Sequence, residues 1–243
     1  MENLKSIIPN SLTSLNLACG CIATLSMLNH HYLLAIVLIS VATIADFLDG
    51  FVARLLKVQS DLGKELDSLA DMVSFGVVPG TILYVALSKA LGIESFDEIL
   101  KSQNFLPFSG YIITVFSALR LAKFNIDTRQ SNSFIGLPTP ANTLFFITIP
   151  LIWLFGKDNE TANDLITSLP VLIGITIVFS YLLIAEIPLI ALKFKTWVFK
   201  ENVAKYILIL GSIISISILG YLAIPVILIL YILVSIIENI KKV

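Results

Sequence analysis

The chain has 243 residues and a formal net charge of −1; 57% of its residues are hydrophobic and only 14% are charged. This composition excludes an ordinary soluble domain, in which about 25% of the residues are charged. The near-neutral balance, without a basic stripe, also argues against a nucleic-acid-binding protein.

Long apolar runs recur along the whole chain. A helix needs about 20 mostly apolar residues to cross a bilayer, and eight runs approach this length, near residues 14–29, 31–54, 65–90, 106–126, 141–156, 166–191, 203–219 and 221–239. We therefore predict an all-α fold, a polytopic integral membrane bundle of about eight transmembrane helices. The chain is expected to form a single domain over 1–243, with a six-span core at 16–191 and two additional spans at 203–239.

The segment before the first span is expected to form a helix of its own. Apolar side chains recur there at spacings of three and four residues, at Leu4, Ile7, Ile8, Leu12 and Leu15. This periodicity gives a helix one apolar face. We therefore predict an interfacial helix over 1–15 that lies on the membrane surface.

The basic residues predict the orientation of the bundle. In an eight-span arrangement the Lys and Arg residues fall in connections on one side of the membrane, and only Lys89, Lys101 and Lys157 of the 16 fall on the other side. Lys and Arg are enriched in cytoplasmic loops of membrane proteins. Both termini, and the polar connection between the second and third spans, are therefore expected on the cytoplasmic side.

Four aspartates gather at that connection, within DFLDGFVARLLKVQSDLGKELDSLAD at residues 46–71. Asp46 and Asp49 are three residues apart and Asp67 and Asp71 are four apart, so each pair shares one face of a helix. We expect the pairs at the end of the second span and at the start of the third. A turn between the two helix ends then brings all four carboxylates together, while Asp61 and Glu65 fall outside the pattern.

A cluster of four carboxylates favours bound cations, because like charges oppose one another's ionisation. Oxygen ligands suit magnesium, manganese or calcium, and two such ions make a clamp for phosphoryl oxygens. The small residues Gly50 and Ala53 leave room for a ligand, and the planar fork of Arg54 suits a phosphate. The alternative to a phosphate-binding site is a protein of another class, a cation-coupled membrane transporter in which the acidic residues line an ion pathway.

The pattern DGxxAR-x8-GxxxDxxxD runs from Asp49 to Asp71, with Asp46 three residues ahead. It resembles the signature of the CDP-alcohol phosphatidyltransferases. The resemblance implies a multi-span enzyme with its active site at the cytoplasmic face, where an alcohol attacks a CDP-linked lipid and displaces CMP. It implies two divalent cations, Mg2+ or Mn2+, with Ca2+ binding without turnover. It assigns Asp46, Asp49, Asp67 and Asp71 as metal ligands, and Asp71 also as the general base.

The same resemblance implies contacts to the CDP-lipid from two parts of the chain. In the signature they are Gly50, Ala53, Arg54, Ser60 and Gly63; in the upstream stretch PNSLTSLN they are Asn10, Thr13 and Asn16. The alternative for the upstream stretch is capping of the first helix by Asn10, Ser11 or Thr13.

Two later stretches bear on the acceptor alcohol: ALRLAKFNID at 118–127 and FIGLPTPAN at 134–142. Both resemble the bacterial and archaeal phosphatidylserine synthase branch of the family. This implies CDP-diacylglycerol and L-serine as substrates in a prokaryotic cell membrane, with serine contacts from Arg120, Lys123 and Asn125. The alternatives are inositol phosphate or glycerol phosphate as acceptor, and plain membrane anchoring by these basic residues.

The resemblance also implies a homodimer. Gly76 and Gly80 lie four residues apart on the third span. Such small residues allow two helices to approach closely in a membrane. We therefore expect a partner helix to pack against this face.

Overall fold

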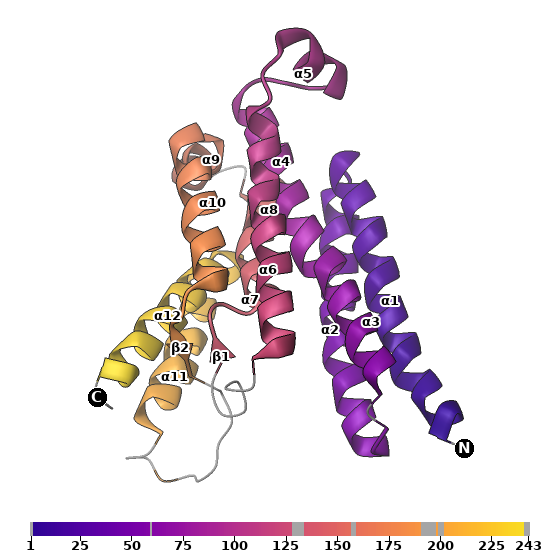
Figure 1. Ribbon diagram of the computed structural model, residues 1–243. Helices are drawn as coiled ribbons and strands as arrows, with labels where there is room; N and C mark the ends of the chain where they lie inside the picture. Colours follow the sequence, from indigo (N-terminus) through magenta and orange to yellow (C-terminus); the bar gives the residue numbers. More distant parts are fainter. Residues whose placement is uncertain are drawn as a thin grey trace.

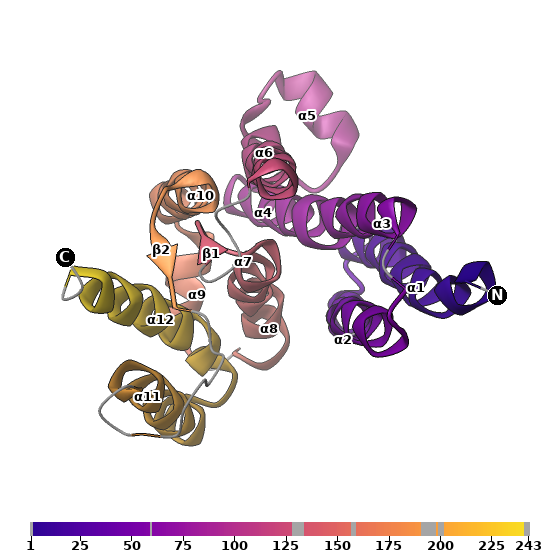
Figure 2. The same cartoon turned by 60° about the horizontal axis from the view of Figure 1, so that its bottom comes forward.

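The computed structural model describes residues 2–58, 60–127, 134–156, 159–190, 198 and 202–240. These residues are helical apart from connections and one pair of two-residue strands, which confirms the predicted all-α class. Figure 1 shows the helices of the N-terminal part on one side, α4 and α6 in the centre, and the C-terminal helices on the other side. Figure 2 shows the same arrangement turned toward the end where both termini lie.

The first half of the bundle is built from long helices. Their bounds are α1 (Glu2–Leu28), α2 (Tyr32–Leu56), α3 (Asp61–Met72), the π-helical turn η1 (Val73–Val77) and α4 (Val78–Ala90). The segments α3, η1 and α4 follow one another without interruption. Helix α1 packs against both α2 and α3, so the N-terminal segment forms one wall of the space between them.

The second half contains shorter and bent elements. They are α5 (Phe96–Ser102), the 3-10 helix η2 (Leu106–Tyr111), α6 (Ile112–Ile126), α7 (Thr139–Phe146), α8 (Thr148–Phe155), α9 (Glu160–Thr167), α10 (Leu169–Ile184), α11 (Val203–Leu219), the 3-10 turn η4 (Gly220–Leu222) and α12 (Ala223–Ile240). Strand β1 (Phe134–Ile135) pairs antiparallel with β2 (Pro188–Leu189). This pairing joins the segment before α7 to the segment after α10.

The expected count of eight spans is not confirmed. By length and composition, four helical stretches of the described chain are able to cross a membrane, or up to six if each bent pair counts as one span. The difference arises in two places. Thr139–Phe155 is too short for a full span, and α11 and α12 fall within one 38-residue helical stretch that contains the turn η4.

The segment 1–15 does not form a separate helix. Helix α1 runs without a break from Glu2 to Leu28 and contains Pro9. The expected boundary between an interfacial helix and the first span is therefore wrong, and the membrane-surface location of this segment stays a prediction. The described ends of α1 and α12 lie at the same end of the molecule in Figure 1.

Helix α4 lies at the centre of the packed interior, with Val78, Ile82 and Leu83 among its fully buried residues. Gly76 and Gly80 serve this packing. A Cβ atom on Gly76 would lie 3.2 Å from Cβ of Ser117, and one on Gly80 would lie 2.2 Å from the hydroxyl oxygen of Thr114. Both glycines therefore admit α6 of the same chain, so this face does not receive a second copy.

Candidate active site

The four aspartates come from α2 and α3, but they do not lie at the helix ends. Helix α2 continues past Asp49 to Leu56, and α3 begins at Asp61, well before Asp67. The expectation that the carboxylates mark the ends of two spans is therefore wrong. At a rise of about 1.5 Å per residue, Asp49 lies about 10 Å inside the end of α2, so the carboxylates sit within the helical bundle.

Three of the four carboxylates converge closely. Asp46, Asp49 and Asp67 each offer an oxygen, and these oxygens all lie within 4.8 Å of one another. Asp49 is buried and the other two are half-buried. Asp71 lies one helical turn beyond Asp67, beside the trio rather than within it.

Helix α1 holds two of these carboxylates in place. The hydroxyl of Thr13 donates a hydrogen bond to Asp49, and the side-chain amide of Asn16 donates one to Asp71 at 3.4 Å. Thr13 and Asn16 are both buried. The hydroxyl of Ser74 in turn donates to the backbone carbonyl of Asn16 at 2.9 Å, which ties α1 to the turn below Asp71.

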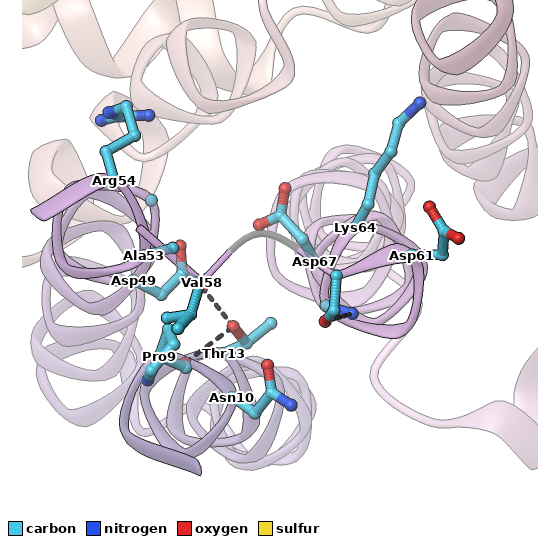
Figure 3. A pocket seen from close by; sticks show the side chains of 13 residues that line it. Pro9, Asn10, Thr13, Asp49, Ala53, Arg54, Val58, Asp61, Lys64 and Asp67 are labelled. Carbon is cyan, nitrogen blue, oxygen red and sulfur yellow. Dashed lines mark hydrogen bonds between the residues drawn. The ribbon is translucent and has the colours of Figure 1, made fainter. Parts of the chain in front are cut away.

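A cavity of about 390 Å³ opens between α1, α2 and α3 (Figure 3). Asp49 and Asp67 reach it from α2 and α3, and α1 contributes residues of its first turns. The remaining walls are mostly residues that the sequence assigned to CDP-lipid binding: Asn10, Thr13, Gly50, Ala53, Arg54, Ser60 and Gly63. This volume falls in the range of ordinary small-molecule sites.

The turn between α2 and α3 shapes one end of the cavity. Lys57 ends α2 with a left-handed backbone conformation, φ 56°, and the N–H of Val58 donates back to the carbonyl of Ala53 at 3.0 Å. Ser60 caps α3, because its hydroxyl accepts a hydrogen bond from the N–H of Gly63 at 3.0 Å. The chain thereby reverses direction within a few residues and faces α2 and α3 toward one cavity.

The donor set fits a hard divalent cation. It consists of carboxylate oxygens alone, from Asp46, Asp49 and Asp67. Magnesium, manganese and calcium prefer such oxygen ligands. A bound phosphate would have Arg54 nearby, since a Cβ on Gly50 would lie 3.3 Å from a guanidinium nitrogen of Arg54. Gly50 thus makes room for Arg54 as well as for a ligand.

The residues expected to bind the acceptor separate into two places. Arg120 and Lys123 line a second cavity, of about 300 Å³, on the side of α6 that faces α10. Arg120 is buried, and its helix α6 contacts α3, which carries Asp67 and Asp71. The side-chain amide of Asn125 instead donates to the hydroxyl of Ser68 on α3, at 2.8 Å.

Sequence reasoning missed several features of the site. Asn16 was assigned to the nucleotide, whereas the structure sets it beneath the cavity against Asp71. Asp61, dismissed as outside the pattern, lines the cavity together with Lys64, whose ammonium donates to the carbonyl of Asn125 at 3.0 Å. Lys64 lies three residues before Asp67 and seven before Asp71, which places it on the same helix face and was the available signal for it.

Comparison with known proteins agrees with this geometry. Residues 6–189 match the family model of the CDP-alcohol phosphatidyltransferases. The CDP-diacylglycerol–serine O-phosphatidyltransferase of Bacillus subtilis is 39% identical over 133 residues, 55% of this chain and 69% of that protein. The enzyme of the same name from Helicobacter pylori strain 26695 is 33% identical over 177 residues, 71% of this chain and 69% of that protein.

An archaeal relative extends this set. The CDP-diacylglycerol–serine O-phosphatidyltransferase of Methanocaldococcus jannaschii is 38% identical over 149 residues, 60% of this chain and 63% of that protein. The matched family region includes the aspartates, the cavity that they line, and the strand pair beyond α6. The chain belongs to the CDP-alcohol phosphatidyltransferase family.

Proposed function

We propose that this protein is an integral membrane enzyme that transfers the phosphatidyl group from CDP-diacylglycerol to the hydroxyl of L-serine and releases CMP. The observation that carries the proposal is the convergence of Asp46, Asp49 and Asp67 beside a cavity, which Asp49 and Asp67 line together with residues of the family signature. The bacterial and archaeal relatives named for serine transfer favour serine as the acceptor.

In this proposal the CDP-lipid occupies the cavity between α1, α2 and α3. Its cytidine and diphosphate contact Asn10, Thr13, Gly50, Ala53, Arg54, Ser60 and Gly63, with Asn16 beneath them. Arg54 offers a planar set of donors to phosphate oxygens. The acyl chains extend into the surrounding bilayer.

The four aspartates are proposed to hold two divalent cations, Mg2+ or Mn2+. When bound, such cations neutralise the diphosphate and stabilise the charge that develops on the departing CMP. The carboxylates orient these ions from two different helices. Thr13 orients Asp49 by its hydrogen bond.

Asp71 is proposed as the general base. Its carboxylate takes the proton of the serine hydroxyl while the hydroxyl oxygen forms a bond to the phosphorus of the phosphatidyl group. The bond between that phosphorus and the oxygen it shares with the second phosphate breaks, and CMP leaves with the electron pair. Asn16 holds Asp71 in position, and Arg120 and Lys123 are the proposed serine contacts, while Asn125 ties α6 to α3.

The reaction is tested with purified protein in detergent or lipid, CDP-diacylglycerol, labelled serine and Mg2+ or Mn2+. We expect CMP and labelled phosphatidylserine to form in equal amounts, and a chelator to stop both until the metal is restored. Inositol phosphate and glycerol phosphate serve as competing acceptors. Release of CMP with either of these but not with serine would refute the serine assignment, and no release with any acceptor would refute the enzyme and favour a transporter.

The orientation and assembly are proposed on separate grounds. The sided distribution of basic residues favours cytoplasmic termini and a cytoplasmic active site. A homodimer is proposed from the family alone, and its interface lies on a surface other than Gly76 and Gly80, which pack within the chain. Labelling of single cysteines from each side of the membrane tests the orientation. Cross-linking in bilayers tests the homodimer, and the detection of monomer alone would contradict it.

A further inference from the structure

The second cavity carries charges of both signs. Its walls come from the last turn of α6, from β1 and from the end of α10. Arg120 and Lys123 supply two cations, and Asp127 and Glu186 supply two carboxylates. The remaining lining is aliphatic and consists of Ile126, Ile135, Leu183 and Ile184. A small polar cavity with paired opposite charges differs from the carboxylate-rich cavity that the CDP-lipid occupies.

The backbone fixes Glu186 opposite α6. Gly136 adopts φ +77°, and a Cβ atom on it would lie 2.6 Å from the carbonyl oxygen of Leu183, so only glycine fits there. The N–H of Gly136 donates to the carbonyl of Ile187 at 3.0 Å, and the N–H of Leu137 donates to that of Leu182 at 2.9 Å. With the β1–β2 pairing, these bonds clamp the end of α10 on both sides of Glu186.

The cavity adjoins the reaction centre through Arg120. Arg120 is only 7% exposed, and its guanidinium carbon lies 4.9 Å from the centroid of the Phe124 ring. Its helix α6 is tied to α3, which carries Asp71, by the hydrogen bond from Asn125 to Ser68. A carboxylate held by Arg120 therefore lies close to the proposed general base. Glu186 lines the same cavity as Arg120.

We propose that this cavity is the binding site of a zwitterionic amino-acid acceptor, in which Arg120 and Lys123 receive the carboxylate and Glu186, assisted by Asp127, receives the ammonium. The inference rests on the proposed function and adds to it the residues that select the acceptor. Carboxylate and ammonium groups are bonded to the same carbon in serine, so one small cavity with both signs of charge complements them. A polyol phosphate carries only negative charge and is repelled by the two carboxylates.

The test is Glu186→Gln in the full-length protein, which removes the charge and keeps the size. Loss of a hydrogen bond to a charged partner lowers affinity about tenfold. We expect the KM for serine to rise about tenfold, with the KM for CDP-diacylglycerol and kcat changed less than twofold. Activity with 3-hydroxypropanoate, which lacks the ammonium, should not fall, so the preference for serine over this acceptor shrinks about tenfold. Glu186→Asp should restore part of the preference.

Glu160→Gln is the matched control, because it removes an exposed carboxylate at the start of α9. It should leave the KM for serine and the KM for CDP-diacylglycerol unchanged. Unchanged melting temperatures of the two variants exclude misfolding as a cause. An unchanged preference in Glu186→Gln, or equal losses with both acceptors, would overturn the inference while leaving serine transfer by the unaltered protein intact. If the unaltered protein does not use serine at all, the proposed function fails first.

Discussion

The hydroxyl of Thr13 on α1 donates a hydrogen bond to the carboxylate of Asp49 on α2, and both side chains are buried. Residues that orient a metal ligand in this way typically contribute about 10–100-fold to metal affinity. We expect Thr13→Val to raise the Mg2+ concentration needed for half-maximal activity about tenfold. The measurement is a metal titration of CMP release, supported by calorimetric titration of Mn2+.

Ser14→Ala is the control for this variant. The Ser14 hydroxyl is exposed and donates to the backbone carbonyl of Asn10 at 2.8 Å, without contact to a carboxylate. Its metal titration should match that of the unaltered protein. A Thr13→Val curve that coincides with the control would show that the hydrogen bond does not orient a metal ligand.

Asp71→Asn separates chemistry from binding. If Asp71 removes the proton from the acceptor, the variant loses the general base, which contributes about 10²–10⁴-fold to the rate, and CMP release should fall by at least about a hundredfold. CDP-diacylglycerol affinity should change much less than the rate, because Asp46, Asp49 and Asp67 remain to hold a cation. Glu65→Gln, on an exposed part of α3, is expected to behave as the unaltered protein. A large loss of donor affinity in Asp71→Asn would count against the base assignment.

The contact between α1 and η1 is tested at Gly20. A Cβ atom there would lie 2.3 Å from the hydroxyl oxygen and 2.9 Å from Cα of Ser74. Such overpacking costs about 1–3 kcal/mol, and relief of the clash moves α1, which carries Asn16. We expect Gly20→Ala to lower both the melting temperature and kcat.

Gly174→Ala on α10 provides the comparison, because no described atom outside its own helix lies within 4 Å of the added Cβ. Alanine is favoured over glycine in a helix, so this variant should be as stable as the unaltered protein. Equal melting temperatures for the two variants would mean that α1 accommodates a Cβ atom at residue 20 without loss of stability, which would contradict a tight contact between α1 and η1.

Two arginines distinguish the two cavities. Arg54 lines the cavity of the carboxylate trio and Arg120 lines the cavity beyond α6. We expect Arg54→Ala to raise the KM for CDP-diacylglycerol about tenfold with little change for serine, and Arg120→Ala to do the reverse. Full kinetics with each substrate varied in turn measure both effects. Similar effects of Arg120→Ala on both substrates would make Arg120 a scaffold residue.

The sequence was sufficient to predict most of the residues that line the first cavity, but not Asp61 and Lys64. The spacing of Asp46 and Asp49, and of Asp67 and Asp71, places each pair on one helix face, and a short turn then leaves few arrangements for α2 and α3. It was not sufficient to locate the helix ends, because the polarity of the chain changes gradually across Leu56–Asp61 while the caps at Lys57 and Ser60 are local backbone features. The carboxylates were therefore placed too close to the surface.

Long-range contacts were the least predictable. The hydrogen bond of Asn16 to Asp71 joins residues 55 positions apart, and the cavity that Glu186 and Arg120 share lies next to a two-residue strand pair. Neither relation has a local signature. The FIGLPTPAN stretch was used only as a family resemblance, whereas its Gly136 is the residue that admits the end of α10.

The π-helical turn Val73–Val77 sets the angle between two faces of one span. A π turn has its hydrogen bonds from i to i+5 and so contains one residue more than an α turn. The residues after it are rotated by about 100° relative to their positions in a continuous α-helix, given 3.6 residues per turn. Asp67 and Asp71 lie before the turn and face α1 and α2, while Gly76 within it and Gly80 after it face α6. The carboxylate face and the glycine face of this span therefore depend on the number of residues between them. Deletion of one residue within the turn would keep the helix but would rotate either the carboxylates or the glycines away from their partners. The length of the chain at this turn is thus as constrained as the residue types.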